Sequence, residues 1–179
     1  MRILILGGTG MLGHTLWQMY ADRHDTAVTI RHTFGDLRAH GIFDPARTFE
    51  RVNAENPHTV EQAVKQWRPD AVINCIGIIK QSPLAKDRHT SILINALFPH
   101  QLARVCNKHD ARLVHISTDC VFSGTPRGSR REAGEGRTQS AHSGPSHGRG
   151  NKHGLNLYTE DDPSDALDDY GKTKYLGEV

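Results

Sequence analysis

The stretch Gly7-Gly8-Thr9-Gly10-Met11-Leu12-Gly13 follows directly after the apolar run Ile3 to Leu6 and decides the fold of this sequence. Its glycines fit G-x-G-x-x-G at positions 8, 10 and 13, and G-x-x-G-x-x-G at positions 7, 10 and 13. Glycine permits the tight turn, lets backbone N–H groups approach a pyrophosphate, and lets the next helix pack closely on the strand. A lone glycine-rich turn is often only flexible, but here a predicted strand precedes it and a predicted helix follows. We therefore predict a dinucleotide site, with the phosphates at the N-terminus of the helix.

The pattern around this turn predicts an α/β fold, a Rossmann-like doubly wound parallel sheet. Up to Gly124, short apolar runs alternate with amphipathic stretches, which is typical of a β-α-β series. We predict strands at residues 2–6, 26–31, 49–52, 71–76 and 113–116, and helices at 11–23, from Pro57 to the residue before Pro69, at 88–109 with a kink at Pro99, and from 168 onward. The first helix is expected to face inward through Met11, Leu12, Thr15, Leu16 and Met19, and the long helix through Ile92, Leu93, Ala96, Leu97, Leu102 and Val105. Trp17, Trp67 and His115 are expected to be packing residues, with the histidine satisfied in the core.

Composition narrows the class of protein. The chain has 179 residues, with 36% hydrophobic and 23% charged residues, which suits one domain. A net charge of +2 gives no field that would indicate a nucleic acid or an anionic membrane as partner, and no apolar run approaches the roughly 18 residues of a membrane span. With no secretory pattern at its start, the protein is expected to be cytoplasmic. Its three cysteines, Cys75, Cys106 and Cys120, have no C-x-x-C spacing and are interpreted as reduced thiols.

Residues 126–155 differ sharply from the rest of the sequence. They contain seven glycines and five arginines, and their only apolar side chains are Ala133, Ala141 and Leu155. We expect this segment to be a disordered insert within a single partial NAD(P)-binding domain at residues 1–179, because it cannot bury enough apolar surface to order itself. Its histidines, at 142, 147 and 153, lack a rigid frame, so no metal site is predicted.

The end of the second predicted strand favours NADP over NAD. Enzymes that select NAD usually place an acidic residue here to hold the ribose 2′-hydroxyl. This sequence has Arg31, whose guanidinium group suits a 2′-phosphate. The alternative is that Arg31 is only an exposed strand-end arginine and that Asp36 takes the hydroxyl.

Three polar residues indicate acid-base chemistry. Tyr170 and Lys174 are four residues apart on a predicted helix and therefore share one face. An ammonium group near a tyrosine stabilises its phenolate and lowers its pKa from roughly 10, which makes it a better proton donor at neutral pH. Thr118 follows the fifth predicted strand, where its hydroxyl would hold a substrate carbonyl. Taken singly, Tyr170 and Lys174 are a common surface pair, and Thr118 a common cap of a turn.

The combined motifs resemble a known family. The quoted turn, Asn74 to Gly77, His115 to Gly124, Tyr158 to Pro163 and Tyr170 to Lys174 are similar to the extended short-chain dehydrogenase/reductases, and within them most similar to the dTDP-4-dehydrorhamnose reductases, which are RmlD-like sugar-nucleotide-binding proteins. The resemblance implies a catalytic triad of Thr118, Tyr170 and Lys174. It also implies a cofactor site composed of Gly7, Gly10, Met11, Leu12, Gly13, Arg31, Asn53, Cys75, Ile76, Gly77, Asn95, Tyr170 and Lys174. Asn53 stands where the family commonly has an aspartate.

The function implied by this resemblance is NADPH-dependent reduction of the 4-keto group of a nucleotide-linked 6-deoxy sugar, as in dTDP-rhamnose biosynthesis. The alternatives are an epimerase or dehydratase of the same superfamily, a noncatalytic NADP-binding regulatory module, and an inactive truncated product. Proteins of the family have a short loop in place of residues 126–155 and continue well beyond the position of Lys174. We therefore expect the sheet to be incomplete on its C-terminal side and the substrate domain to be absent. The resemblance alone leaves a homo-oligomer open.

Overall fold

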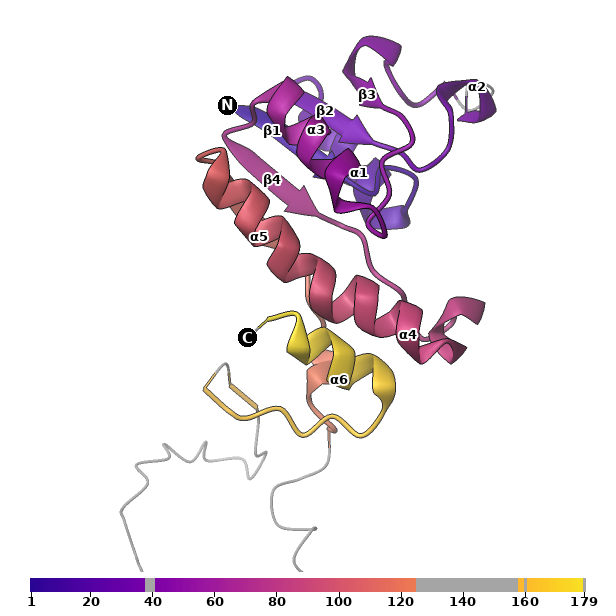
Figure 1. Ribbon diagram of the computed structural model, residues 1–179, viewed down its shortest axis with the longest axis vertical. Coiled ribbons are helices and arrows are strands. Elements are labelled where there is room, and N and C mark those ends of the chain that lie inside the picture. The colour runs from indigo at the N-terminus through magenta and orange to yellow at the C-terminus, as the bar shows by residue number, and fades with distance from the viewer. Residues whose placement is uncertain (38–40, 125–157, 160, 179) are drawn as a thin grey trace, which may run out of the picture.

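The computed structural model describes residues 1–37, 41–124, 158–159 and 161–178. Its sheet has five parallel strands in the order β3-β2-β1-β4-β5, and helices lie against it (Figure 1). The strands are β1 (Arg2–Leu6), β2 (Asp25–Thr29), β3 (Thr48–Phe49), β4 (Ala71–Asn74) and β5 (Arg112–His115). The helices are α1 (Met11–Tyr20), α2 (Phe34–Leu37), η2 (Pro45–Arg47), α3 (Pro57–Trp67), η3 (Pro83–Lys86), α4 (Arg88–Ser91), η4 (Ile92–Leu97), α5 (Phe98–Lys108), η5 (Asp119–Val121) and α6 (Asp169–Leu176). The prediction of a Rossmann-like parallel sheet is confirmed, and this strand order is the one that such sheets use.

The central strand β1 explains how the layers are held together. Leu4 and Leu6 face a core formed with α3 and α5, while Ile3 and Ile5 face a second core formed with α1. Because successive side chains of a strand point to opposite faces, a continuous apolar run is what a strand buried on both faces requires. The carboxyl ends of the parallel strands therefore lie together at one edge of a well-packed sheet.

Helix α1 covers its face of the sheet with different residues from those predicted. Met11, Leu12 and Met19 are exposed, whereas Gly13 and Trp17 are buried. The cause is Gly13, where an added Cβ would lie 2.2 Å from the carbonyl oxygen of Gly7. This close approach turns the helix so that Gly13 and the residue one turn later face the sheet. Of the predicted stripe, Leu16 packs against the core as predicted, whereas Met11, Leu12, Thr15 and Met19 are exposed.

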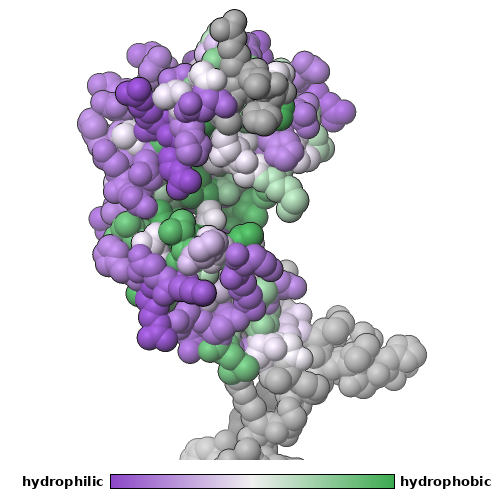
Figure 2. Space-filling model, turned by 90° about the vertical axis from the view of Figure 1, so that its right-hand side faces the viewer, coloured by the Kyte–Doolittle hydropathy of each residue, from purple (hydrophilic) through white to green (hydrophobic). Residues whose placement is uncertain are grey.

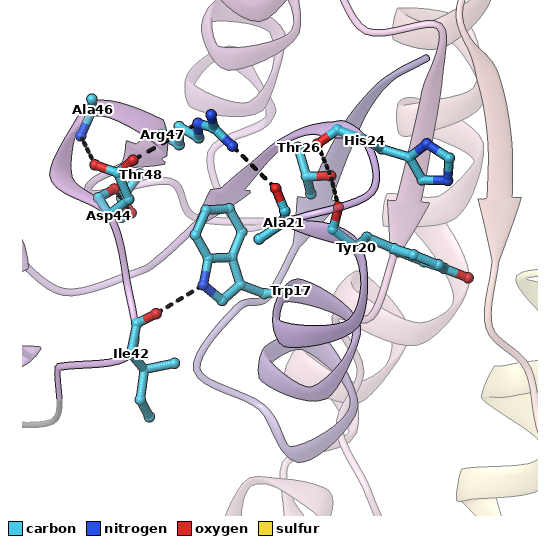
Figure 3. Close-up of polar contacts among 10 residues, drawn as sticks. All are labelled: Trp17, Tyr20, Ala21, His24, Thr26, Ile42, Asp44, Ala46, Arg47 and Thr48. Atoms are coloured by element: carbon cyan, nitrogen blue, oxygen red, sulfur yellow. Dashed lines mark hydrogen bonds and ion pairs between the residues drawn. The ribbon is translucent and has the colours of Figure 1, made fainter.

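The segment that follows α2 holds the far end of α1 (Figure 3). The indole N–H of Trp17 donates to the carbonyl oxygen of Ile42 at 2.8 Å, and the guanidinium group of Arg47 donates to the carbonyl oxygen of Ala21 at 3.2 Å. Arg47 follows Asp44, whose carboxylate caps η2 by accepting the N–H of Ala46 at 2.9 Å. These contacts give the carbonyl at the C-terminus of α1 a donor and cover the indole.

The predicted long helix is continuous from α4 to α5, but η4 between them is a π-helix. A π-helix has i→i+5 hydrogen bonds and therefore shifts the side chains that follow it around the axis. Ile94 and Asn95 are buried, while Ile92 and Leu97 are about half exposed, so the predicted inward face is wrong at those two positions. Ala96 is buried and Leu93 packs against the core, as predicted. Leu102 is buried as predicted.

Element boundaries differ from the predictions by a few residues. Strand β2 ends at Thr29, although the N–H of Ile30 still donates to the carbonyl oxygen of Phe49 in β3. Helix α3 and the inward orientation of Val60 and Val64 are as predicted, and the helix ends at Arg68 in a left-handed conformation. Within the described residues, no helix has the length and apolar character needed to cross a bilayer.

The two sides of residues 125–157 meet next to η5. The rings of Phe122 and Tyr158 stack with centroids 4.5 Å apart, and the carboxylate of Asp165 accepts the backbone N–H of Ser123 at 2.6 Å. The tyrosine hydroxyl also donates to Asp165 at 2.9 Å. The predicted insert and its histidines lie outside the described residues.

Candidate cofactor and acid-base site

The glycine turn leaves backbone donors available at the start of α1. Gly7 has a left-handed φ of +83°, and its N–H donates to the hydroxyl of Thr29 at 3.2 Å. The N-cap is Gly10, and among the described residues no side chain caps the first turn. The first N–H groups of a helix have no partner inside the helix, and the helix dipole favours an anion at this end. The turn therefore has the features of a phosphate site.

A cleft of about 390 Å³ opens at the carboxyl ends of β1, β2 and β4. Seven of the residues predicted to bind cofactor line it: Gly7, Gly10, Arg31, Asn53, Cys75, Ile76 and Gly77. Figure 2 shows apolar side chains gathered around a hollow between more polar parts of the surface. An apolar wall with a few polar groups at its ends is typical of a cleft that accepts a nucleotide.

Several residues of the cleft were missed by the sequence analysis. Most come from the connection after β3 and from the one between β4 and α4, and the last two lie on α4 and η4: Val52, Ala54, Glu55, Ile78, Ile79, Ser82, Leu84, Thr90 and Ile94. Thr9 and Thr29 complete the wall next to the turn. Apolar residues in irregular connections carry no periodic signal, so the sequence did not indicate that these segments form a wall.

Arg31 lies in the wall of the cleft, whereas Asp36 does not. The carboxylate of Asp36 accepts the backbone N–H and the hydroxyl of Thr33 at 3.1 and 2.7 Å, and the hydroxyl is the main cause of its lowered pKa. Within the described part of the chain Arg31 makes no ion pair, so its guanidinium group is available to a ligand. This arrangement favours Arg31 over the alternative based on Asp36.

Asn53 and Cys75 both have local roles in this structure. The side-chain oxygen of Asn53 accepts the backbone N–H of Glu55 at 3.1 Å. The backbone N–H of Asn53 donates to the hydroxyl of Thr59 at 3.0 Å. Burial raises the pKa of the Cys75 thiol to about 11, so that it is neutral at physiological pH. Both residues thus shape the cleft without adding a charge to it.

Asn95 connects the floor of the cleft to α6. Its side chain accepts the N–H of Ile78 at 2.8 Å and donates to the carbonyl oxygen of the same residue at 3.0 Å. The amide nitrogen also lies 3.4 Å from the hydroxyl of Thr173. Asn95 is buried and does not line the cleft, so it acts here on the backbone of the cleft wall.

The predicted triad comes from the end of the β5 region and from α6, which the structure brings together. In α6, an added Cβ at Gly171 would lie 2.2 Å from the carbonyl oxygen of Cys120, so the helix packs directly on η5. Thr118 is the N-cap of η5, and its hydroxyl accepts the N–H of Cys120 at 3.2 Å, which is the capping alternative weighed from the sequence. Tyr170 lies in the first turn of α6 and Lys174 one turn later.

Lys174 is buried, with 4% of its surface exposed, and its ammonium group donates to the carbonyl oxygen of Ile116 at 2.7 Å. Burial lowers its pKa, and Glu178 partly offsets that effect. An added Cβ at Gly77 would lie 3.9 Å from the Lys174 nitrogen, which places the ammonium group next to the cleft floor. Lys174 is therefore located between the cleft and the end of β5.

Met11 and Leu12 are exposed at the start of α1, and neither they nor Gly13 line the cleft.

His115 is only partly satisfied, which corrects the expectation of a satisfied core histidine. Its Nδ1 lies 3.0 Å from the side-chain nitrogen of Asn74, so the amide donates to the ring. Its Nε2 is buried and has no hydrogen-bond partner among the described residues. Burial, and then the charges of Lys174 and His100, lower the pKa of His115 to about 4.

The strand order and the glycine turn at the carboxyl end of β1 define a Rossmann-like α/β domain. The family model described as the RmlD substrate binding domain matches residues 1–179, and this chain belongs to that family. A probable dTDP-4,6-dihydroxy-2-methyloxan-3-one 4-ketoreductase from Streptomyces antibioticus is 27% identical over 179 residues, which are 99% of this chain and 45% of that protein. The chain thus spans about half the length of this relative.

Two solved structures extend the comparison. A dTDP-4-dehydrorhamnose reductase from Bacillus anthracis in complex with NADP has a TM-score of 0.64 and 25% identity, covering 99% of this chain and 47% of its own. The Bordetella bronchiseptica enzyme WbmG in complex with NAD and UDP has a TM-score of 0.69 and 20% identity, covering 99% of this chain and 48% of its own. The second likeness shows the fold alone.

Proposed function

We propose that this chain supplies the NADPH site and the acid-base helix of a reductase that acts on the 4-keto group of a nucleotide-linked 6-deoxy sugar. The observation that carries the proposal is the cleft at the carboxyl ends of the strands, which has an uncapped glycine turn, Arg31 in its wall, and α6 packed close by. The NADP complex of the Bacillus anthracis relative and the ketoreductase name of the Streptomyces antibioticus relative support the same class of reaction.

The residues present fit a dinucleotide. Among the described residues, the N–H groups of Met11 and Leu12 in the first turn of α1 have no acceptor. A Cβ at Gly8 would lie 2.1 Å from the side chain of Val28, so the glycine turn stays close to β2. Arg31 would hold the 2′-phosphate, and the N–H groups at the start of α1 would hold the pyrophosphate, which Gly7 and Gly10 allow to approach closely because they have no side chain. When bound, the cofactor supplies the hydride.

In this proposal the side chains act on the substrate carbonyl. Tyr170 donates its phenolic proton to the carbonyl oxygen, and Thr118 orients that oxygen by a hydrogen bond from its hydroxyl. The positive charge of Lys174 stabilises the phenolate that remains. The substrate wall would come from the part of the relatives that this chain does not span.

Cofactor affinity tests the first half of the proposal. We expect NADPH to bind more tightly than NADH, and Arg31→Ala to weaken NADPH binding by roughly ten- to a hundredfold, as for the loss of one or two hydrogen bonds to a charged group. Isothermal titration measures both ligands, and Arg104→Ala, at an exposed position of α5, is the matched control. Equal affinity for the two nucleotides, unchanged by Arg31→Ala, would remove the argument for NADPH.

Turnover tests the second half. A chimera that joins this chain to the C-terminal half of the Streptomyces antibioticus relative is expected to oxidise NADPH in the presence of a dTDP-4-keto-6-deoxy sugar. The 179 residues by themselves, which span 45% of that relative, are expected to turn over more slowly than the chimera, because a substrate that is not oriented reacts slowly. Tyr170→Phe keeps the ring and removes only the hydroxyl. A chimera whose activity survives this change would contradict the assignment of the proton donor.

A further inference from the structure

Lys80 connects the cleft wall to the start of α6. It follows Ile79 in the connection after β4, and its ammonium group lies 2.6 Å from Oδ2 of Asp168. The other oxygen of the same carboxylate accepts the N–H of Gly171 at 2.8 Å, as the N-cap of α6. One carboxylate therefore fixes both the first turn of α6 and the position of the Lys80 charge.

The same ammonium group lies over the ring of Tyr170, 5.8 Å from its centroid. This distance is within the range in which a cation interacts with an aromatic face. Lys174, the cation expected from the sequence to assist Tyr170, instead donates to the carbonyl oxygen of Ile116 and is buried. In this structure, then, the cation placed against the ring of Tyr170 is Lys80.

Charge coupling between Lys80 and Tyr170 acts in both directions. A hydrogen bond from Lys80 to Asp168 is the main cause that raises the pKa of Lys80, and the ionised forms of Cys120 and Tyr170 add smaller contributions. Because the ionised form of Tyr170 stabilises the charged form of Lys80, the charged Lys80 stabilises the phenolate of Tyr170 to the same extent.

We propose that Lys80 is a positioning residue for the acid-base site: held by Asp168 over the ring of Tyr170, its ammonium group stabilises the phenolate. The proposal rests on the proposed function for its role in catalysis, since a phenolate forms there when Tyr170 gives up its proton. Lys80 also lines a hollow of about 290 Å³ with Asp168 and Leu167. With 46% of its side chain exposed, Lys80 is accessible to solvent.

Other charged groups near Tyr170 are held in different contacts. Arg88 of α4 pairs with Asp169 at 2.7 Å, so the charges at the start of α6 are compensated in pairs. The helix η4, which also packs on α6, has no titratable residue. The remaining titratable groups on the elements packed there are His89 of α4, Asp119 and Cys120 of η5, and Lys172, Lys174 and Tyr175 of α6.

The titration of Tyr170 tests the proposal directly. Labelling with tyrosine that carries ¹³C at Cζ gives one NMR signal for each of the four tyrosines, and the Tyr170→Phe variant identifies the relevant one. For unit charges at this separation in a solvent-exposed setting, we expect Lys80→Met to raise the titration midpoint of Tyr170 by about half a pH unit. Lys80→Arg, which keeps the charge, is expected to leave the midpoint near that of the unmodified chain.

Lys86→Met is the matched control, because Lys86 is an exposed lysine of η3 that has no contact with Tyr170. An unchanged midpoint in Lys80→Met, an equal rise in Lys86→Met, or a rise of the same size in Lys80→Arg would each overturn the proposal. NADPH titration of the same samples keeps the two hypotheses apart. If the unmodified chain does not bind NADPH, the proposed function is contradicted, whereas the titration midpoint of Tyr170 decides the role of Lys80.

Discussion

Acidification below about pH 6.5 is expected to destabilise this protein through His115. Burial lowers the pKa of His115 to about 4 in the folded chain, while an unfolded histidine titrates near 6.5. Between these values the unfolded chain binds more protons than the folded chain, so the free energy of unfolding falls as the pH decreases from about 6.5 towards 4. Integrated between pH 7.5 and pH 5, the full difference would be about 2 kcal/mol, and solvent screening around the partly exposed ring reduces the expected loss to about 1 kcal/mol.

Urea unfolding at the two pH values measures this loss, with the fluorescence of Trp17 and Trp67 as the signal, because both indoles pack in the two cores. His115→Asn is the matched control. An asparagine oxygen can accept from the Asn74 amide in place of Nδ1, but it does not titrate. The carboxylates with lowered pKa values remain ionised at pH 5: Asp36, Glu61, Asp87 and Asp168.

The unmodified chain should therefore lose about 1 kcal/mol more than His115→Asn on going from pH 7.5 to pH 5. If the two proteins lose the same free energy of unfolding, then the buried Nε2 is not the cause, and the reasoning from its missing partner is refuted.

Two further changes address the scaffold. Gly13→Ala is expected to lower the free energy of unfolding by about 3 kcal/mol and to abolish NADPH binding, because the new Cβ meets the Gly7 backbone at 2.2 Å. Gly35→Ala is the control, because a Cβ there has its nearest neighbour at 3.7 Å. Equal stability of the two variants in urea unfolding would contradict the close packing at Gly13. Replacing residues 126–155 by a four-residue Gly-Ser linker is expected to keep the fold and to raise stability by about 1 kcal/mol, because the contacts of Phe122 and Tyr158 lie outside the deletion and a shorter loop costs less entropy to close. Thermal unfolding would show the opposite result, a large loss of stability, if that segment contributed to the core.

Local patterns were sufficient to predict the sheet. The apolar run of β1 and the glycine turn after it specify a buried parallel strand and a close helix, and the structure has both. Helix faces were harder to predict, because they depend on contacts between elements. Gly13 turns α1 towards Trp17, and the π-helix rotates Ile94 into the core, and neither effect is visible in residue periodicity.

The candidate site was predictable where its residues follow strands. Arg31 and Gly77 lie at strand ends, and the order of a parallel sheet brings such positions together. Lys80 was not predicted, because an exposed lysine is common and its partner Asp168 lies far away in the sequence. The roles of Asn95 and Gly171 as bridges between the cleft, η5 and α6 likewise appear only when the chain is folded.

The location of the cofactor tests the central claim most directly. In a ¹H–¹⁵N correlation spectrum of the labelled chain, stepwise addition of NADPH is expected to shift the amide signals of Gly7, Gly10, Arg31 and Gly77 in a saturable manner. The amides around Lys108, at the C-terminal end of α5 and next to the amino ends of the strands, should not move. Shifts that are absent, or that cluster around Lys108 and leave the glycine turn unaffected, would contradict the assignment of the cleft as the nicotinamide dinucleotide site.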